Sequence, residues 1–258
     1  MCDVSRDTVP FPSTAKSPPT PLFSQITGGP KFVGIGIGVQ NYTCASAGTF
    51  SSTGAVAELF DISCLSEVTY EVLTDLTFAA WKDAPSSITV QKVIDELDIF
   101  HPAFVLGQHY FIVNPITGSG LSPKWDFTSA SEAYHPDAFV VGAKTGDVPA
   151  PTAPQTNVDW LSLSATQGEL AQQVFRVETR GGQPPSSCTP GSADISVKYT
   201  STYCKHYLSI VLKKVSSQPH PQGSSAALSS RLRDFMNADP RSCLHSISVS
   251  ALASRCRA

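Results

Sequence analysis

The sequence predicts an all-β protein whose main domain, residues 31–207, is a single antiparallel β-barrel or β-sandwich. Three observations support this prediction. Short β-type runs recur between turn-forming residues, and they do not alternate with helices as the strands of α/β folds do. Charged residues make up only 15% of the chain, against roughly 25% in an average soluble domain, so the composition suits a globular protein with a large core.

The predicted elements follow in order from residue 1. We expect residues 1–30 to be an irregular leader, because a proline-rich Ser/Thr segment sustains neither helix nor sheet hydrogen bonding. The expected strands then cover residues 31–40, 54–61, 68–78, 88–93, 109–113, 139–143, 174–179 and 195–202. Residues 88–100 are the one stretch that competes as a helix of useful length.

Residues 208–258 are expected to be a basic, disordered tail. From residue 205 onward the chain holds eight basic and two acidic side chains, a local charge of +6 within a total of −3. A basic extension of this kind is either unstructured or binds an acidic surface. The near-neutral total gives no electrostatic footprint for nucleic acid, and no apolar run approaches the roughly 20 residues that cross a bilayer. We therefore expect neither nucleic-acid binding nor a membrane span.

Recognisable cofactor and hydrolase motifs are missing from the sequence. Residues 34–38, Gly-Ile-Gly-Ile-Gly, are not a dinucleotide fingerprint, because Val39 stands where the third glycine belongs and no helix opens there. We interpret them as a strand whose alternate glycines let a neighbouring strand or a ligand approach closely. Neither G-x-S-x-G nor H-E-x-x-H occurs, and the histidines form no close pair, so we expect no cofactor and no metal.

Strand alternation selects a first set of candidate site residues. In residues 107–111, His109 and Phe111 share one face of the predicted strand, while Gln108 and Tyr110 share the other. One of these faces should look into the core or a pocket. His109 and Tyr110 cannot both point into one lumen if the strand is regular.

Two isolated cations lie on otherwise apolar strands. Arg176 shares a strand face with Val174 and Glu178, and Lys198 is the cation of the last predicted strand. The solvent face is the more common place for such side chains, whereas a polar lumen would be lined by them. Trp125 is either a core or rim aromatic or a platform for an apolar ligand.

Five sequence blocks together resemble one protein family. They are residues 40–44, 54–61, 107–111, 158–161 and 176–188, and they follow the family's order over about residues 31–203. The family comprises secreted fungal proteins long carried as a domain of unknown function and often mislabelled malate dehydrogenase. Its characterised branch, the intermolecular hetero-Diels–Alderases of tropolone sesquiterpenoid biosynthesis, consists of glycosylated β-rich proteins that need no cofactor.

This resemblance implies an enzyme that joins two small molecules. A hydroxymethyl tropolone would lose water to give a quinone methide, which adds across an alkene of a humulene-type terpene. Holding two such partners in a reactive pose is worth roughly 7–11 kcal/mol. The alternative is a secreted non-enzymatic binding or surface protein with the same β-fold. A large apolar pocket with a few convergent polar groups would favour the enzyme, and a side-chain-filled lumen would favour the alternative.

The resemblance also implies roles for the candidate residues. Lys198 or Arg176 would hydrogen-bond the tropolone oxygens, and His109 or Tyr110 would supply the proton for the departing hydroxyl. The terpene would rest on aromatic rings and be bound by burial alone. The substrate-binding residues expected beside these four are Gln108, Phe111 and Trp125.

One sequon and the seven cysteines point to a secretory route. We expect Asn41, in the sequon Asn-Tyr-Thr, to begin a surface loop and to carry a glycan. The resemblance implies a disulfide between Cys44 and Cys64, with Cys188 as a competing partner. Residues 1–7 contain no apolar h-region, so secretion would need a different N-terminus from the one written.

Overall fold

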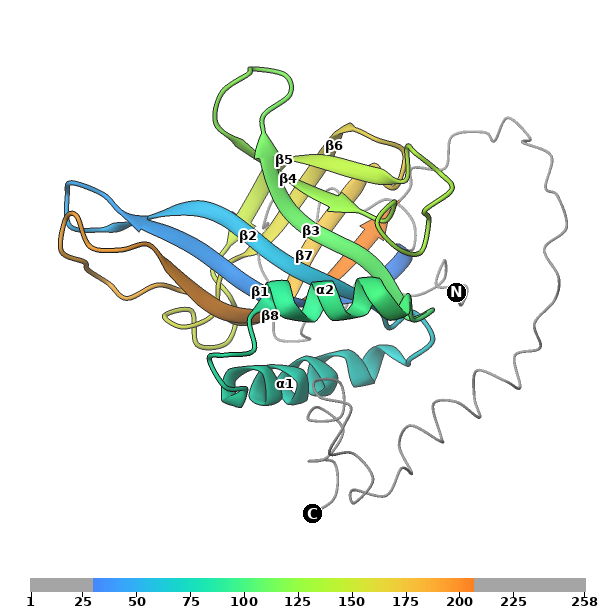
Figure 1. The fold of residues 1–258 in the computed structure, drawn as a ribbon, viewed down its shortest axis with the longest axis horizontal. Coiled ribbons are helices and arrows are strands. Elements are labelled where there is room, and N and C mark those ends of the chain that lie inside the picture. The colour runs from blue at the N-terminus through green and yellow to red at the C-terminus, as the bar shows by residue number, and fades with distance from the viewer. Residues whose placement is uncertain (1–29, 207–258) are drawn as a thin grey trace, which may run out of the picture. The chain divides into compact units, whose positions relative to one another are not determined.

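Residues 30–206 form a closed barrel of eight antiparallel strands in the computed structural model, which describes these residues of the chain (Figure 1). The elements are β1 (Pro30–Cys44), β2 (Phe50–Asp61), α1 (Glu67–Asp83), α2 (Val90–Phe100), β3 (Val105–Val113), β4 (Leu121–Asp126), β5 (Phe139–Val148), β6 (Trp160–Gln167), β7 (Gln173–Gly181) and β8 (Ile195–His206). Each strand pairs with the next along the chain, and β8 pairs with β1. The predicted all-β class is confirmed, in its barrel form.

The predicted leader and tail lie outside the described residues, except that Pro30 already begins β1. Two helices join β2 to β3 and lie on one side of the barrel (Figure 1). The predicted strand over residues 68–78 is wrong, because this stretch belongs to α1. The predicted strand over residues 88–93 is also wrong, and the competing helix over 88–100 corresponds to α2. Buried side chains of α1 recur with a helical rather than a strand period, at Tyr70, Thr74, Thr77 and Trp81.

The pairing of β2 with β3 is short. It runs from Ala57 to Phe60, and nearer its loops the β1–β2 hairpin diverges from the β3–β4 hairpin (Figure 1). We call this end of the barrel the mouth; it carries the loops β1–β2, β3–β4, β5–β6 and β7–β8. Neither β4 nor β6 is among the predicted strands, and Pro123 interrupts the β-type pattern of β4.

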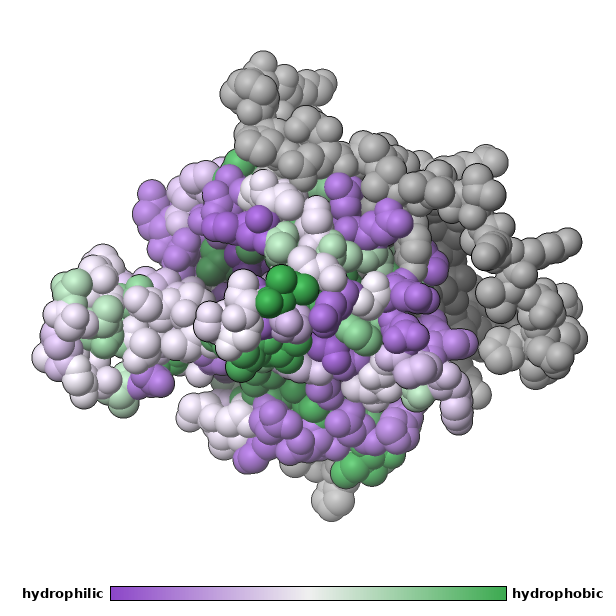
Figure 2. Space-filling view, turned by 90° about the horizontal axis from the view of Figure 1, so that it is seen from above, coloured by the Kyte–Doolittle hydropathy of each residue, from purple (hydrophilic) through white to green (hydrophobic). Residues whose placement is uncertain are grey.

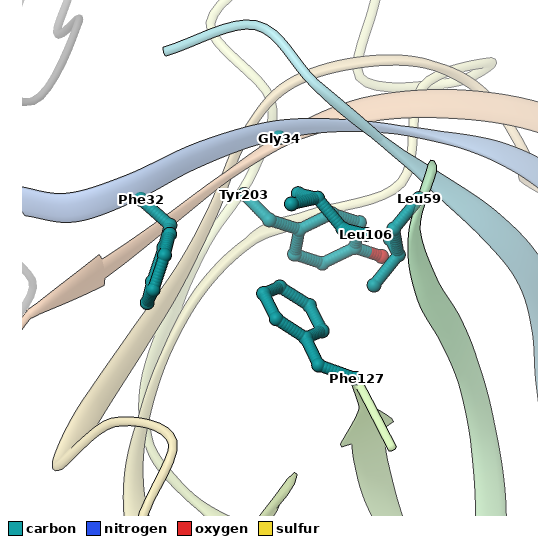
Figure 3. A pocket seen from close by; sticks show the side chains of 6 residues that line it. All are labelled: Phe32, Gly34, Leu59, Leu106, Phe127 and Tyr203. Atoms are coloured by element: carbon teal, nitrogen blue, oxygen red, sulfur yellow. The ribbon is translucent and has the colours of Figure 1, made fainter. Parts of the chain in front are cut away.

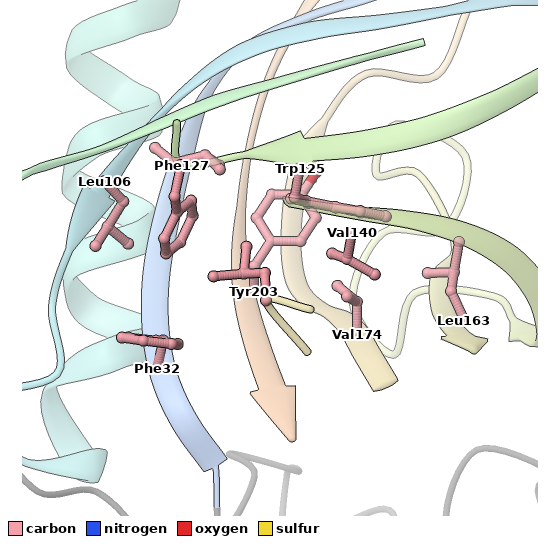
Figure 4. Close-up of a cluster of buried hydrophobic side chains, with 10 residues drawn as sticks. Phe32, Leu106, Trp125, Phe127, Val140, Leu163, Val174 and Tyr203 are labelled. Atoms are coloured by element: carbon pink, nitrogen blue, oxygen red, sulfur yellow. The ribbon is translucent and has the colours of Figure 1, made fainter. Parts of the chain in front are cut away.

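The barrel wall divides the hydrophobic core into an outer and an inner part. The outer cluster joins Tyr70 of α1 to strand residues such as Val33, Ile35, Phe175 and Val177. The inner cluster fills the barrel interior, which we call the lumen (Figure 4). Its buried members are Phe32, Leu59, Leu106, Trp125, Phe127, Val140, Leu163, Leu170, Val174 and Tyr203.

The alternate glycines of β1 make room for lumen side chains. A Cβ atom on Gly34 would lie 2.8 Å from Leu106 Cδ1, and one on Gly36 would lie 2.7 Å from Tyr203 Cε2. Both distances are too short for real carbon contacts, so only glycine lets these side chains pack against β1. At Gly38 the backbone of β2 approaches in the same way, at Val56 and Ala57. The expected close approach of a neighbouring strand is thus confirmed at Gly38, and at Gly34 and Gly36 the approaching groups are side chains of the barrel interior.

A disulfide links Cys44, at the end of β1, to Cys188 in the β7–β8 loop. Because β8 pairs with β1, this loop lies beside the end of β1, and the two Cα atoms are 5.9 Å apart. The predicted Cys44–Cys64 pairing is wrong. Cys64 follows the 12 residues of β2, which run back along the barrel for on the order of 40 Å. A disulfide fits a protein of the secretory pathway or the cell exterior.

Asn41 lies within β1 rather than at the start of a loop. It pairs with Gly54 of β2 and Ser196 of β8, and its side-chain oxygen accepts a 2.7 Å hydrogen bond from the Ser196 hydroxyl. The side chain points away from the lumen, since Gln40 before it points inward, and it is half-buried. Glycosylation of Asn41 stays a prediction.

Candidate functional site

The barrel wall separates the predicted site residues into two groups. Three of them face the lumen: His109, Phe111 and Trp125. There the His109 ring contacts the rings of Phe111, Trp125 and Tyr203, and Phe111 packs against the cluster that contains Ala57. Arg176 also faces inward, because it alternates with Val174 of the inner cluster and its charge acts on the lumen phenol of Tyr199. On the outer face lie Gln108, Tyr110 and Lys198. The single pocket lining expected from the sequence is therefore divided between two faces.

His109 is held in a fixed orientation inside the barrel. Its ring stacks on the Trp125 indole with centroids 4.5 Å apart and an interplanar angle of 13°. Its Nδ1 atom lies 2.9 Å from the backbone oxygen of Lys124. A carbonyl oxygen only accepts hydrogen bonds, so Nδ1 is the donor in this contact.

Two tyrosine hydroxyls meet deep in the lumen. Tyr199 and Tyr203 lie four residues apart on the same face of β8, and their hydroxyl oxygens are 3.0 Å apart. Burial raises the pKa of Tyr199 well above its ordinary value. Nearer the mouth, burial also raises the pKa of Tyr42 to about 12, and its hydroxyl donates to the Gly182 oxygen over 2.8 Å. The Tyr199 and Tyr42 phenols therefore keep their protons near neutral pH and act as hydrogen-bond donors rather than bases.

Arg176 is the cation on the lumen side of the mouth. Its Nε and Nη2 atoms donate to the backbone oxygen of Asp159, over 3.1 Å and 2.8 Å. The remaining nitrogen, Nη1, has no hydrogen-bond partner among residues 30–206. Burial raises the pKa of the Asp159 carboxyl, and the Arg176 charge opposes that effect. The guanidinium is therefore oriented by protein contacts while one edge is left for another acceptor.

Two buried polar groups on lumen-facing residues have no hydrogen-bond partner in the described part of the chain. They are Trp125 Nε1 on β4 and Ser201 Oγ on β8. The Gln40 side chain on β1 instead reaches the Tyr199 hydroxyl, and this contact lowers the pKa of Tyr199 against the larger effect of burial. A buried polar group without a partner costs roughly 1–3 kcal/mol, and most native proteins contain few of them. The lumen thus carries unused hydrogen-bonding capacity on two separate strands. Ser201 was not predicted as a site residue, although strand alternation places it on the same face of β8 as Tyr199.

Side chains fill the lumen at the end opposite the mouth. Six residues there pack so closely that the space between them does not admit a water molecule (Figure 3). They are Phe32, Gly34, Leu59, Leu106, Phe127 and Tyr203. A hollow of about 300 Å³ lies on the rim of that end, with acidic side chains of Glu132, Asp137 and Glu169 in its lining. The filled end is a packed core, so a ligand of the lumen has to approach from the mouth.

Lys198 has a structural task on the outer face. Its Nζ atom donates to the backbone oxygens of Trp81 and Ala84, over 2.9 Å and 2.7 Å, at the end of α1. The same atom lies 4.5 Å from the centre of the Trp81 ring. A cation at the last carbonyls of a helix satisfies them and matches the helix dipole. Lys198 therefore fastens α1 to β8.

Tyr110 belongs to a polar network on the outside of β3 and β4. Its hydroxyl donates to Asp126 Oδ2 over 2.7 Å, and Lys124 Nζ forms a salt bridge with the same oxygen, also at 2.7 Å. Burial raises the pKa of Tyr110, and hydrogen bonds from Lys124 and Thr128 hold the pKa of Asp126 below its ordinary value although burial opposes this. The polar groups of this network are hydrogen-bonded to one another, and they lie on the outer face of the barrel, away from the lumen.

Glu178 departs from the regular alternation. A β-bulge between Val177 and Arg180 gives Glu178 a φ of +48°, so it does not share the inner face with Arg176 as predicted. Its carboxylate instead lies 3.5 Å from Arg180 Nη1, on the side of α1. Within residues 30–206 no group of three or more His, Cys, Asp or Glu side chains is arranged to hold a metal ion. Neither described helix has the length and apolar character needed to span a membrane.

Comparison with known proteins gives one match. Searches of curated proteins and of solved structures found none that is significantly similar. The sequence profile of a family described as a protein of unknown function, DUF3455, matches residues 27–206, which include all strands and helices of the barrel. The expected membership in a domain-of-unknown-function family is confirmed, and the chain belongs to the DUF3455 family.

Proposed function

We propose that this protein is a cofactor-independent hetero-Diels–Alderase that joins a tropolone quinone methide to a humulene-type sesquiterpene at the mouth of its barrel. The observation that carries this proposal is the pair of unused polar groups inside the barrel, on Trp125 and Ser201. A planar, oxygen-rich ligand offers acceptors to such donors, whereas an entirely apolar core would not need them. The resemblance of the five sequence blocks to the fungal hetero-Diels–Alderases suggests the reaction class.

Arg176 is the residue proposed to bind the tropolone oxygens. Its two occupied nitrogens fix the guanidinium against Asp159, and Nη1 remains for a ligand oxygen. A cation oriented before the ligand arrives stabilises charge that develops on the carbonyl oxygen as the leaving hydroxyl departs. Lys198, the other cation considered, is committed to the end of α1 on the outer face.

His109 is the residue proposed to move the proton. Because Nδ1–H faces the Lys124 oxygen, Nε2 can accept the proton of the tropolone hydroxyl. The imidazolium then returns this proton to the departing hydroxyl of the hydroxymethyl group, which leaves as water. The products are the quinone methide, water and the neutral imidazole, so the step needs no oxidant, reductant or cofactor.

The cycloaddition itself forms one carbon–carbon and one carbon–oxygen bond as the quinone methide meets the terpene alkene. The protein contributes by holding both partners close together, which is worth roughly 7–11 kcal/mol for well-oriented pairs. Phe111 and the Trp125–His109 stack offer apolar faces to the hydrocarbon.

A second candidate is a secreted binding or surface protein without catalytic activity. The filled end of the lumen favours it, because the side chains packed there cannot receive a ligand without rearrangement. On this alternative, the orphaned donors are a cost of the fold rather than a binding device. The two candidates differ in one measurable property, the formation of a covalent adduct.

The test is to incubate the purified protein with a hydroxymethyl tropolone and α-humulene and to follow adduct formation by chiral chromatography. We expect adduct to form faster than in buffer and with one stereoisomer in excess. A rate and a stereoisomer ratio equal to those in buffer would rule out the enzyme and leave the binding protein. A heat-denatured sample controls for catalysis by buffer components.

A further inference from the structure

Apolar side chains are exposed together on the β3–β4 hairpin. Val113 and Leu121 face each other across the two strands and are 61% and 50% exposed. Ile116, in the turn between them, is 68% exposed. Figure 2, which views the barrel from the side of this hairpin, shows hydrophobic side chains gathered near the middle of a face that is otherwise largely hydrophilic. We call Val113, Ile116 and Leu121 the hairpin patch.

Hydrogen bonds hold the turn in a defined shape. The Asn114 side-chain oxygen accepts from the backbone nitrogens of Ile116 and Thr117, over 2.9 Å and 3.1 Å. The backbone nitrogen of Asn114 donates to the backbone oxygen of Gly120 over 3.0 Å, which closes the turn. Ile116 is therefore held exposed by an ordered loop, so the binding free energy of a ligand that covers it is not reduced by the entropy cost of ordering that loop.

The hairpin patch continues into the lumen on one strand face. Going inward from the Val113–Leu121 pair, the cross-strand pairs on the same face are Phe111–Pro123 and then His109–Trp125. Phe111 packs over Gly54 of β2, where a Cβ atom would lie 3.0 Å from the Phe111 side chain. Exposure falls along this path from 61% at Val113 to 2% at His109. The face thus leads from solvent to the proposed catalytic histidine.

The absence of charged side chains from the hairpin favours an uncharged ligand. No charged side chain occurs between residues 113 and 123. An ionic ligand would lose its hydration here without a partner, and an anionic membrane surface would find no basic side chain in the loop. Three side chains expose at most a few hundred Å² of apolar surface, less than the roughly 800 Å² that each partner of a stable protein complex buries.

We propose that the hairpin patch is the docking site for an uncharged hydrocarbon, and that Val113, Ile116 and Leu121 bind it before it passes Phe111 to the lumen. The inference rests on the proposed function, since it assigns the hydrocarbon partner to the outer half of the same site. The oxygenated partner then takes the inner half, beside Arg176 and His109.

The experiment measures binding of α-humulene without the second substrate, from its loss from the headspace above the full-length protein. We expect the double variant V113S/I116S to bind humulene about tenfold more weakly, because the two serines offer the hydrocarbon less apolar surface to cover. The matched control is Val72→Ser on α1, where valine is 58% exposed but away from the hairpin, and it should bind like the wild type. In the adduct assay the double variant should raise KM for humulene and leave the rate at saturating humulene unchanged.

Several outcomes would overturn this inference. The first is that the double variant binds humulene as well as the wild type does and still forms adduct. That result would remove the hairpin patch as a docking site and leave the proposed function standing. Another is an equal loss in Val72→Ser. A third is sedimentation of the wild type, but not of the double variant, with neutral phosphatidylcholine vesicles, which would make the patch a membrane contact. If the wild type binds humulene at the hairpin but forms no adduct, the docking site stands and the proposed function fails.

Discussion

The imidazole of His109 and the indole of Trp125 stack face to face across β3 and β4 inside the barrel. The stack and the contact of Nδ1 with the Lys124 oxygen leave the His109 ring little freedom to turn. A proton-transfer group has to be oriented before the substrate arrives, and this pair provides such an orientation. The tryptophan ring therefore positions the histidine besides offering its own surface to a ligand.

Replacing His109 should slow the reaction, whereas replacing Tyr110 should not. His109→Phe keeps an aromatic ring on Trp125 but removes the proton acceptor, so we expect adduct formation to fall by roughly 10²- to 10⁴-fold. Tyr110→Phe is the matched control, because its hydroxyl bonds Asp126 on the outer face. Initial rates of both variants give the comparison. Equal rates for His109→Phe and the wild type would remove the histidine from the mechanism.

Breaking the disulfide should destabilise the mouth. Cys44 and Cys188 are separated by 144 residues, and their bond ties the β1–β2 hairpin to the β7–β8 loop. Cys188→Ser should lower the free energy of unfolding by about 2–5 kcal/mol, measured by urea denaturation of secreted protein. Peptide mapping should recover Cys44 joined to Cys188 in the wild type. Recovery of a Cys44–Cys64 peptide would contradict the described connectivity.

Glu58 should make stability fall as the pH rises. It lies on the outer face of β2, is completely buried, and neither carboxylate oxygen has a hydrogen-bond partner in residues 30–206. Burial, and to a smaller extent the nearby charge of Asp98 on α2, raises its pKa to about 8. The folded state thus holds a proton that the unfolded chain releases near pH 4.5. The contribution of protonated Glu58 to the free energy of unfolding is therefore complete below pH 4.5 and is lost as the pH rises through 8.

Glu58→Gln tests this dependence, because the amide keeps the shape and cannot ionise. Relative to the wild type, the variant should gain on the order of 3 kcal/mol of stability between pH 5 and pH 8, followed by thermal unfolding across that range. Glu178, whose pKa burial raises to about 7, titrates in the same range in both proteins and cancels from the difference. A constant difference at all pH values would show that Glu58 does not carry the effect.

Local sequence patterns were sufficient for the strand faces but not for the helices or the barrel closure. The alternation that puts His109 with Phe111 and opposite Tyr110 holds, because β3 is regular over these residues. It fails for Glu178, where a bulge shifts the register. The stretch over residues 68–78 has the β-branched content of a strand and becomes α1, since its helical stripe packs on the barrel.

Long-range pairing decides the rest of the candidate site. Cys44 meets Cys188 only because β8 returns to β1, which no local pattern shows. Closure likewise determines which face of each strand is enclosed, and so separates Arg176 from Lys198. Two cations that look equivalent in the sequence thereby acquire different tasks, one inside the mouth and one at the end of α1.

The pair Arg176→Met and Lys198→Met tests the central claim most directly, because one cation faces the lumen and the other the outside of the same barrel. We predict that Arg176→Met lowers the rate of adduct formation by about 10²- to 10³-fold and loses the stereoisomer preference, as expected when an oriented charge-stabilising donor is removed. Lys198→Met should keep the wild-type rate and stereoisomer ratio while its melting temperature falls, since α1 loses the cation at its last carbonyls. Wild-type catalysis by Arg176→Met, or an equal loss of rate in Lys198→Met, would contradict a reaction site at the mouth of the barrel.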